Sequence, residues 1–497
     1  MISAVTCNGT APIFCGFCFM DNFISKIAEF LNSLDDLIWG PPLLVLLIGI
    51  GLILTVSLRF VQVKRLPLAL RYIVSLPPYR GAAKSKGEIS SFAALCTALG
   101  ATIGTGNIVG VATAVSLGGP GALFWMFVAA FLGMATKYAE CLLAVKFRET
   151  KGNGYYVGGP MYYIKNGIGP KHATFAKILA VAFAVFGIMA GCLGIGTYTQ
   201  LNAIVDAASQ FQIPKVNCAI LLTVILALII LGGLKSVSAA SQKLVPLMGI
   251  FYVVSALCVL WTYAEQIPAA IRMIFEYAFT PASAIGGFTG ATVLMAIQKG
   301  IARGVFSNEA GLGSAPIVAA SARTNHPVEQ GLVNMTGTFI DTIIICMMTG
   351  LTLIITGAWC SETSGAAMTT LAFTTALGPT PGACAVNLSL MLFAFTTILG
   401  WSSYAEKCAV YLFGLNCKIY FRIVFILFVA SYILIVMYVD MNNISDRTAI
   451  NSVWVVSDIA NGLMAFPNLI ALFMLRKVVV SETVDYFRNF LPKAKRQ

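Results

Sequence analysis

Residues 99–109 read Leu99-Gly-Ala-Thr-Ile-Gly-Thr-Gly-Asn-Ile-Val109 and decide the fold. They lie in a run from Ile89 to Thr136 that contains no Asp, Glu, Lys or Arg, long enough for two membrane spans joined by a turn at Gly118–Gly121. A glycine costs about 1 kcal/mol relative to alanine inside a helix. Four glycines nevertheless surround Asn107 in the first span: Gly100, Gly104, Gly106 and Gly110. This pattern predicts a position where the helix opens.

An open helix at membrane depth leaves backbone N–H and C=O groups without partners, at several kcal/mol each. Transporters use such a break: the freed carbonyls bind a cation, and the positive end of the following half-helix faces an anionic group. A second interpretation is that the small residues only allow neighbouring helices to approach closely. Spacing alone does not separate the two interpretations.

Composition indicates a polytopic helical membrane protein. The 497 residues are 58% hydrophobic and 10% charged, with mean hydropathy +0.85, whereas soluble domains carry about 25% charged residues. A net charge of +12 could suggest nucleic acid, but 25 of the 32 Lys and Arg residues fall in alternate loops on one side and only four on the other. By the positive-inside rule, the N-terminus is expected outside and the C-terminus in the cytoplasm.

Charge-poor runs predict eleven spans, at 37–59, 90–117, 119–145, 178–204, 216–234, 244–264, 286–321 (broken), 330–357, 384–413, 419–439 and 448–475. The expected organisation is an external segment 1–36, an additional helix 37–59, five-helix units 90–264 and 286–475, and a cytoplasmic tail 476–497. Because each unit has an odd number of spans, the two units must have opposite orientations, as an inverted repeat requires.

Two sequence blocks resemble the signatures of the alanine/glycine:cation symporter family. The first combines Thr102-Ile-Gly-Thr-Gly-Asn-Ile-Val-Gly-Val-Ala-Thr-Ala-Val115 with Leu117-Gly-Gly-Pro-Gly-Ala-Leu-Phe-Trp125, and the second is Ala302-Arg-Gly-Val-Phe-Ser-Asn-Glu-Ala-Gly-Leu-Gly-Ser-Ala-Pro316. Gly158–Tyr163 and Leu399–Tyr404 are also similar to that family. The resemblance implies an all-α, LeuT-like fold of five plus five helices in an inverted repeat.

The resemblance also implies site residues, carried over position by position. It implies a sodium ion between two helices, bound by the carbonyls of Gly100 and Ile103 and by Ala394 and Thr397. Substrate-binding residues would be Thr102, Gly104, Thr105, Gly106, Asn107, Gln200, Phe306, Ser307 and Trp401. The amides of Thr105 and Gly106 would meet a carboxylate, and the Thr102 carbonyl an ammonium group. A threonine can instead bond to its own helix, Gln200 can join helices, and Trp401 can be structural.

Charged residues inside spans usually face protein or a cavity. Arg303 and Glu309 flank the second break and are expected to form a gate, a coupling pair or a static ion pair. Lys137 and Glu140 are three residues apart on one helix, so they can neutralise each other. Asp341 and Asp458 have no assigned role, although proton relay through them is conceivable.

These features predict a secondary active transporter in a bacterial inner membrane. It would take up a small neutral amino acid, alanine or glycine, with Na⁺ by alternating access. The alternatives are another amino acid, proton coupling or a channel, with an intramembrane enzyme last. The sequence offers no supported nucleophile–base pair, and His172 and His326 are its only histidines, so no catalytic residue, cofactor or metal other than sodium is expected. The expected partners are the amino acid, sodium and membrane lipid, and not nucleic acid.

Overall fold

The computed structural model describes residues 13–75, 87–280, 292–442 and 447–492. About 85% of the structure is helical. The chain begins with α1 (Ile13–Ile38), α2 (Pro41–Ser57), α3 (Val61–Lys64) and α4 (Leu66–Val74). Helices α1 and α2 are separated by a short break at Trp39 and Gly40 and together form one apolar span, Lys26–Ser57. Helix α2 starts with two prolines, which suit the first turn of a helix.

The predicted opening of the first glycine-rich span is confirmed. Helix α5 (Ser91–Thr102) ends at the glycine cluster, and the chain resumes as the π-helix η1 (Gly106–Gly110) and α6 (Val111–Gly118). The two halves meet at 60°. The expected turn follows, with Gly119 at φ 68°, and α7 (Gly121–Lys146) runs back. A Cβ on Gly121 would lie 2.2 Å from the Tyr277 carbonyl oxygen, so this position requires glycine.

The next span breaks where the sequence predicted a continuous helix over 178–204. Helix α9 (Ala173–Leu193) ends at Gly194, and α10 (Tyr198–Ser209) starts after a four-residue interruption. Helices α11 (Lys215–Leu231), α12 (Gly233–Thr262) and α13 (Ile267–Phe279) follow. The short helix α8 (Pro160–Tyr163) and the π-helix η3 (Ile164–Ile168) precede α9.

The second predicted break is also present, three residues later than Phe306. Helix α14 (Val293–Asn308) is separated from α15 (Ala315–Ala319) by residues 309–314, and Glu309, Gly311 and Gly313 adopt positive φ angles there. Helix α16 (Pro327–Thr338) continues through a π-helix, η6 (Phe339–Cys346), into α17 (Met347–Ile355). The chain ends with α18 (Gly365–Leu377), α19 (Pro379–Phe413), α20 (Lys418–Asn442), α21 (Arg447–Asp485) and η9 (Tyr486–Phe490).

Eight helices of the described chain are long and apolar enough to cross a membrane, or nine when α5 and α6 count as one bent span. The shorter α11 and α18 are also apolar. The count of eleven and the five-plus-five repeat stay predictions, since the start of the expected span 286–321 lies partly outside the described residues. Long helices with apolar exposed faces make this a multi-pass membrane protein.

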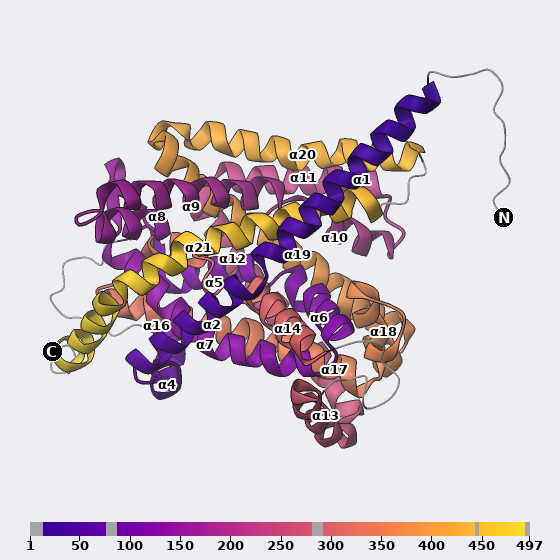
Figure 1. The fold of residues 1–497 in the computed structure, drawn as a ribbon, viewed down its shortest axis with the longest axis horizontal. Coiled ribbons are helices and arrows are strands. Elements are labelled where there is room, and N and C mark those ends of the chain that lie inside the picture. Colours follow the sequence, from indigo (N-terminus) through magenta and orange to yellow (C-terminus); the bar gives the residue numbers. More distant parts are fainter. Residues whose placement is uncertain (1–12, 76–86, 281–291, 443–446, 493–497) are drawn as a thin grey trace.

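The helices pack around α7 and α19. Helix α7 contacts α14 and α16, whereas α19 contacts α5, α9, α10, α12 and α18. Figure 1 shows α20 beside α11 along one edge of the molecule and α13 at the opposite edge. The bent pair α5–α6 and the interrupted pair α14–α15 lie between these two packing centres.

Four short strands are present in the described residues. Strand β1 (Ile89–Ser90) pairs in parallel with β4 (Ala322–Arg323), and β2 (Glu149–Lys151) forms an antiparallel hairpin with β3 (Tyr155–Val157). Because β1 precedes α5 and β4 follows α15, the first pair joins the ends of the two interrupted helices.

Candidate functional site

Asn107 organises the first break. Its side-chain oxygen accepts a hydrogen bond from the Gly104 N–H (2.9 Å), and its amide group donates to Asp341 Oδ1 (2.8 Å). Asn107 is fully buried. The side chain therefore holds the opened backbone and connects it to η6.

Asp341 joins the first break to the end of α14. Besides the bond from Asn107, its carboxylate accepts hydrogen bonds from Ser307 Oγ (2.9 Å) and Thr342 Oγ1 (2.7 Å), and it is fully buried. The sequence assigned Asp341 no role. The sequence feature that could have pointed to Asp341 is its position as an acidic residue inside a charge-poor span. No sequence feature indicated the π-helix η6 that carries it.

The predicted substrate residues on the two interrupted helices lie together. A Cβ on Gly106 would be 3.2 Å from Ser307 Cα and 3.5 Å from Phe306 Cδ1. The Gln200 amide donates to Thr105 Oγ1 (3.2 Å), while its carbonyl oxygen has no partner among the described residues. Thr105 and Gly106 stand at the N-terminus of η1, where backbone N–H groups lack helical partners.

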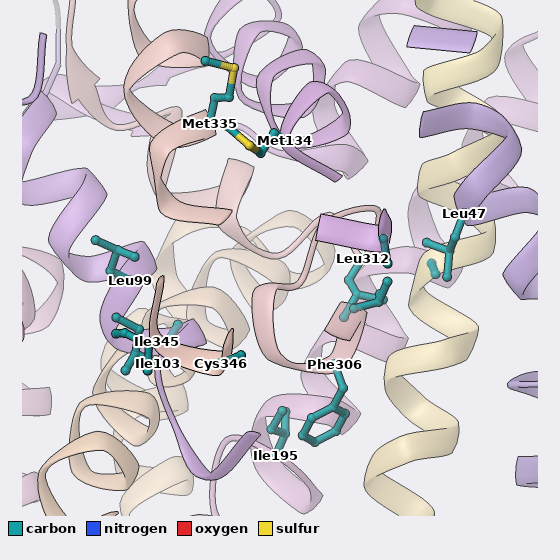
Figure 2. Close-up of a cluster of buried hydrophobic side chains, with 14 of the residues drawn as sticks. Leu47, Leu99, Ile103, Met134, Ile195, Phe306, Leu312, Met335, Ile345 and Cys346 are labelled. Atoms are coloured by element: carbon teal, nitrogen blue, oxygen red, sulfur yellow. The ribbon is translucent and has the colours of Figure 1, made fainter. Parts of the chain in front are cut away.

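Figure 2 shows the apolar surroundings of this region. Ile103 lies beside Ile345 and Cys346, and Phe306 lies beside Ile195 in the unpredicted interruption between α9 and α10. All five of these side chains and that of Leu99 are buried. Three interrupted helices therefore meet here, at the breaks α5–η1, α14–α15 and α9–α10, whereas the sequence predicted the first two of these breaks.

The four predicted sodium residues also converge. The Thr397 hydroxyl of α19 lies 3.1 Å from the Gly100 carbonyl oxygen and 3.4 Å from that of Ile103, and 3.0 Å from the carbonyl of Phe393 in its own helix. Ala394 is buried one turn before Thr397 on α19. A hydroxyl group has one hydrogen, so it can satisfy only one of these three carbonyls at a time.

The neighbouring threonines behave differently. Thr396 Oγ1 bonds back to the carbonyls of Leu392 (3.2 Å) and Phe393 (3.0 Å), and Thr102 Oγ1 bonds to the Leu99 carbonyl (3.2 Å). For both hydroxyls, bonding to the preceding turn is thus the observed state. Thr396 Oγ1 also lies 3.4 Å from Met248 Sδ on α12, whereas Thr397 is the one of the three whose hydroxyl faces backbone carbonyls of a different helix, α5.

Trp401 is fully buried, and its ring packs edge-on against Tyr404 at 5.5 Å. A Cβ on Gly196 would lie 2.7 Å from Trp401 Cβ, so the tryptophan backs onto the interruption between α9 and α10. Trp401 is not among the residues that line the cleft leading to Thr105.

That cleft, which we call the Asp35 cleft, has a volume of about 420 Å³. It is lined by Asn32, Asp35, Thr105, Gly106, Val109, Gly110, Thr113, Arg303, Phe306, Val455 and Asp458. Asn32 and Asp35 belong to α1, so a helix outside both expected repeats contributes to the approach to the site.

Arg303 and Glu309 do not form the predicted pair. Arg303 bonds to Asp458 on α21 (3.3 Å) and lies over the Phe306 ring at 5.5 Å. Glu309 is fully buried and accepts a hydrogen bond from Ser314. The correction has a simple cause: α14 ends at Asn308, and Glu309 adopts a left-handed conformation (φ 56°) that sends its side chain into the break.

A second polar cluster, which we call the Lys407 cluster, closes the other end of α5. Lys407 is 1% exposed, donates to Glu88 Oε1 (3.1 Å) and to the Tyr156 carbonyl (2.6 Å), and lies 3.6 Å above the Tyr155 ring. The Tyr156 N–H also donates to Glu88 Oε1 (2.7 Å). The β2–β3 hairpin is thereby fixed between the start of α5 and the end of α19, a contact that no sequence motif indicated.

The chain is similar to known proteins along most of its length. A family model described as "Sodium:alanine symporter family" matches residues 24–497. The chain is 52% identical to an uncharacterised transporter of Haemophilus influenzae over 465 residues, covering 93% of this chain and 97% of that protein. It is 46% identical to the sodium/alanine symporter AgcS of Methanococcus maripaludis over 467 residues, with the same two coverages.

Among solved structures, MhsT in complex with L-phenylalanine superposes with a TM-score of 0.52 at 15% identity, covering 82% of this chain and 98% of that one. This likeness shows a LeuT-type fold. The family and the fold are those of membrane transporters and not of enzymes. The chain therefore belongs to the sodium:alanine symporter family.

Proposed function

We propose that this protein imports a small neutral amino acid, alanine or glycine, coupled to Na⁺. The observation that carries the proposal is the group of oxygens around Thr397. Its hydroxyl faces the carbonyls of Gly100, Ile103 and Phe393 within 3.4 Å and can donate to only one of them. Neutral oxygens that crowd together without enough hydrogens suit a hard cation. We place Na⁺ here, between α5 and α19.

The amino acid would bind between the two interrupted helices, close to the ion but separate from it. The N–H groups of Thr105 and Gly106 would receive its carboxylate, as the positive end of a helix does for anions. The Thr102 carbonyl would receive its ammonium group. Phe306 and Ser307 would face it from α14, with Gln200 and Trp401 supporting the site from α10 and α19. Gly106 lies so close to Ser307 and Phe306 that even a Cβ there would be within 3.5 Å of both. The two helices are therefore close together at this point, which favours a small substrate such as alanine or glycine.

Proton coupling is the second candidate, and Asp341 is the observation that favours it. This carboxylate is buried and bonds to Asn107 and Ser307, so its protonation would weaken a connection between the two interrupted helices. The Thr397 site, in contrast, contains no group that titrates near neutral pH.

Uptake by proteoliposomes separates these candidates. We expect labelled alanine or glycine to accumulate above the external concentration with an inward Na⁺ gradient, and not with an inward proton gradient alone. Accumulation that follows the proton gradient and ignores Na⁺ would reject the sodium assignment. Uptake that never exceeds equilibration under either gradient would favour a channel.

The positions of the basic residues give the proposed orientation: the Asp35 cleft faces outward and the Lys407 cluster faces the cytoplasm. In a background without reactive cysteines, Lys171→Cys is expected to resist an impermeant thiol reagent in intact cells, and Gln266→Cys to react. Both positions are exposed, so accessibility of the side chain does not limit the comparison. The reverse labelling pattern would invert the assignment of every loop.

A further inference from the structure

A cluster of buried polar side chains surrounds the interruption between α14 and α15. Five buried polar atoms there have no hydrogen-bond partner among the described residues: Lys137 Nζ, Glu140 Oε2, Glu309 Oε1, Trp401 Nε1 and Tyr404 Oη. Each side chain is at most 2% exposed. Buried polar groups are normally paired, so this concentration around one helix break calls for a physical explanation.

Glu140 is held as an acceptor. Its Oε1 receives hydrogen bonds from the Gly311 N–H (3.0 Å) and from the Asn468 amide, which in turn donates to the Gly311 carbonyl (2.8 Å). Tyr163 fixes the orientation of Asn468 by donating to its side-chain oxygen. Hydrogen bonds from N–H groups stabilise the ionised form of a carboxylate, so these two bonds favour the negative charge on Glu140.

Glu309 is held much less firmly as an anion. It accepts a hydrogen bond from the Ser314 hydroxyl, and the Trp401 indole is a second side-chain donor beside it; no backbone N–H group bonds to it in the described structure. It caps the C-terminus of α14, where the partial negative charge of the helix end disfavours a carboxylate. Glu309 is also close enough to Asp341 for the two negative charges to repel each other.

Among the described residues of this cluster, the positive charge is the ammonium group of Lys137. Lys137 lies three residues before Glu140 on α7 and acts electrostatically on Glu140 and Glu309. The neighbouring groups are Asp341 on η6, already bonded to three side chains, and the neutral Cys141, Tyr163 and Tyr404. Arg303, on the same helix as Glu309, is engaged by Asp458. One ammonium cannot neutralise Glu140 and Glu309 together, and it also acts on Asp341, a third buried carboxylate. Three hydrogen bonds compensate the charge of Asp341, whereas an uncompensated charge is disfavoured at membrane depth.

We propose that Glu309 is a proton-binding site and carries a proton at neutral pH, while Lys137 and Glu140 form the neutral pair beside it. The proton comes from solvent and bonds to Oε1, the oxygen that has no partner in the described structure. The resulting O–H group is a donor, and the free Tyr404 hydroxyl oxygen is available as its acceptor. The site is distinct from the proposed Na⁺ ligands and would give transport a pH dependence that does not originate there.

Infrared difference spectroscopy during pH steps tests this proposal on the purified full-length protein, without sodium or amino acid. We expect the wild type to show the carbonyl stretch of a protonated buried carboxyl group at neutral pH. Glu309→Gln should lose that band, and the control variant Asp341→Asn should keep it. Glu140→Gln leaves Lys137 as the counter-ion of Glu309 alone, so Glu309 should ionise and the band should weaken. Persistence of the band in Glu309→Gln, or its absence from the wild type at neutral pH, would overturn the assignment.

A second variant tests the charge count without changing Glu309. Lys137→Met removes the ammonium, so a second carboxyl group is expected to take up a proton and the band should approximately double in area. An unchanged band in Lys137→Met would contradict the one-ammonium, two-carboxylate arrangement. Because no substrate or sodium is present, these outcomes are independent of the uptake experiment: either proposal can fail while the other holds.

Discussion

Gly106→Leu is expected to abolish amino-acid binding while the protein still folds. The first side-chain atom at this position would already lie 3.2 Å from Ser307 Cα and 3.4 Å from Ser307 Cβ. A leucine side chain must extend beyond that point, into the space between the two interrupted helices, where we place the substrate. Equilibrium binding of labelled alanine or glycine to the purified protein should fall by at least 100-fold, about 2.8 kcal/mol at 1.4 kcal/mol for each factor of ten.

The matched control is Gly49→Leu in α2, where a Cβ meets no atom within 4 Å. This variant adds the same side chain to another membrane helix and should bind like the wild type. Size-exclusion profiles should be monodisperse for both variants. Wild-type affinity in Gly106→Leu would remove the first break from the substrate site.

Thr397→Ala is expected to shift the Na⁺ concentration for half-maximal uptake upward by about tenfold, near the 1.4 kcal/mol that a tenfold change represents. The substitution removes the Thr397 hydroxyl, which is the side-chain oxygen of the proposed sodium site. It leaves the carbonyls of Gly100 and Ile103 in place. Substrate affinity should recover in excess Na⁺, because ion and substrate binding are reciprocally coupled.

Two control variants separate ligation from packing. Thr397→Ser retains the hydroxyl and should keep most of the wild-type Na⁺ affinity. Thr396→Ala removes an adjacent buried hydroxyl that bonds to its own helix and to Met248 Sδ but to no carbonyl of the proposed sodium site, so the Na⁺ dependence should change little. An unaltered Na⁺ dependence in Thr397→Ala would mean that Thr397 is not a ligand.

The sequence predicted the parts of the site that glycine and local apolar patterns encode. The break after Gly100, the turn before Gly121 and the interruption near Ser307 all follow from residues that disfavour a continuous helix. The family resemblance then brought Thr397, far away in the chain, next to Gly100 and Ile103, and the structure has that proximity. Whether these residues bind sodium and substrate stays a prediction, as do the unit boundaries.

What the sequence did not predict depends on tertiary contacts. The break between α9 and α10 contains two glycines, Gly194 and Gly196. Glycines are also found within continuous helices of this protein, so these two did not by themselves predict a break. The role of Asp341, which is to connect the two interrupted helices, depends on Asn107 and Ser307, and these become its neighbours only in the folded protein. Arg303 pairs with a residue of another helix because the local chain direction carries Glu309 away from it.

The two interruptions also bear on how the molecule holds its shape. Residues 103–105 and 309–314 are where each interrupted helix can flex. The proposed substrate site lies next to both interruptions, between Thr105–Gly106 and Phe306–Ser307. A bound species stabilises the folded state by RT ln(1 + [L]/Kd), about 2.7 kcal/mol at a hundredfold excess over Kd. Bound substrate and ion should therefore raise the thermal stability of the transporter and restrict the motion of the two interrupted helices. The ligand-free protein should unfold at a lower temperature and be more mobile at these positions.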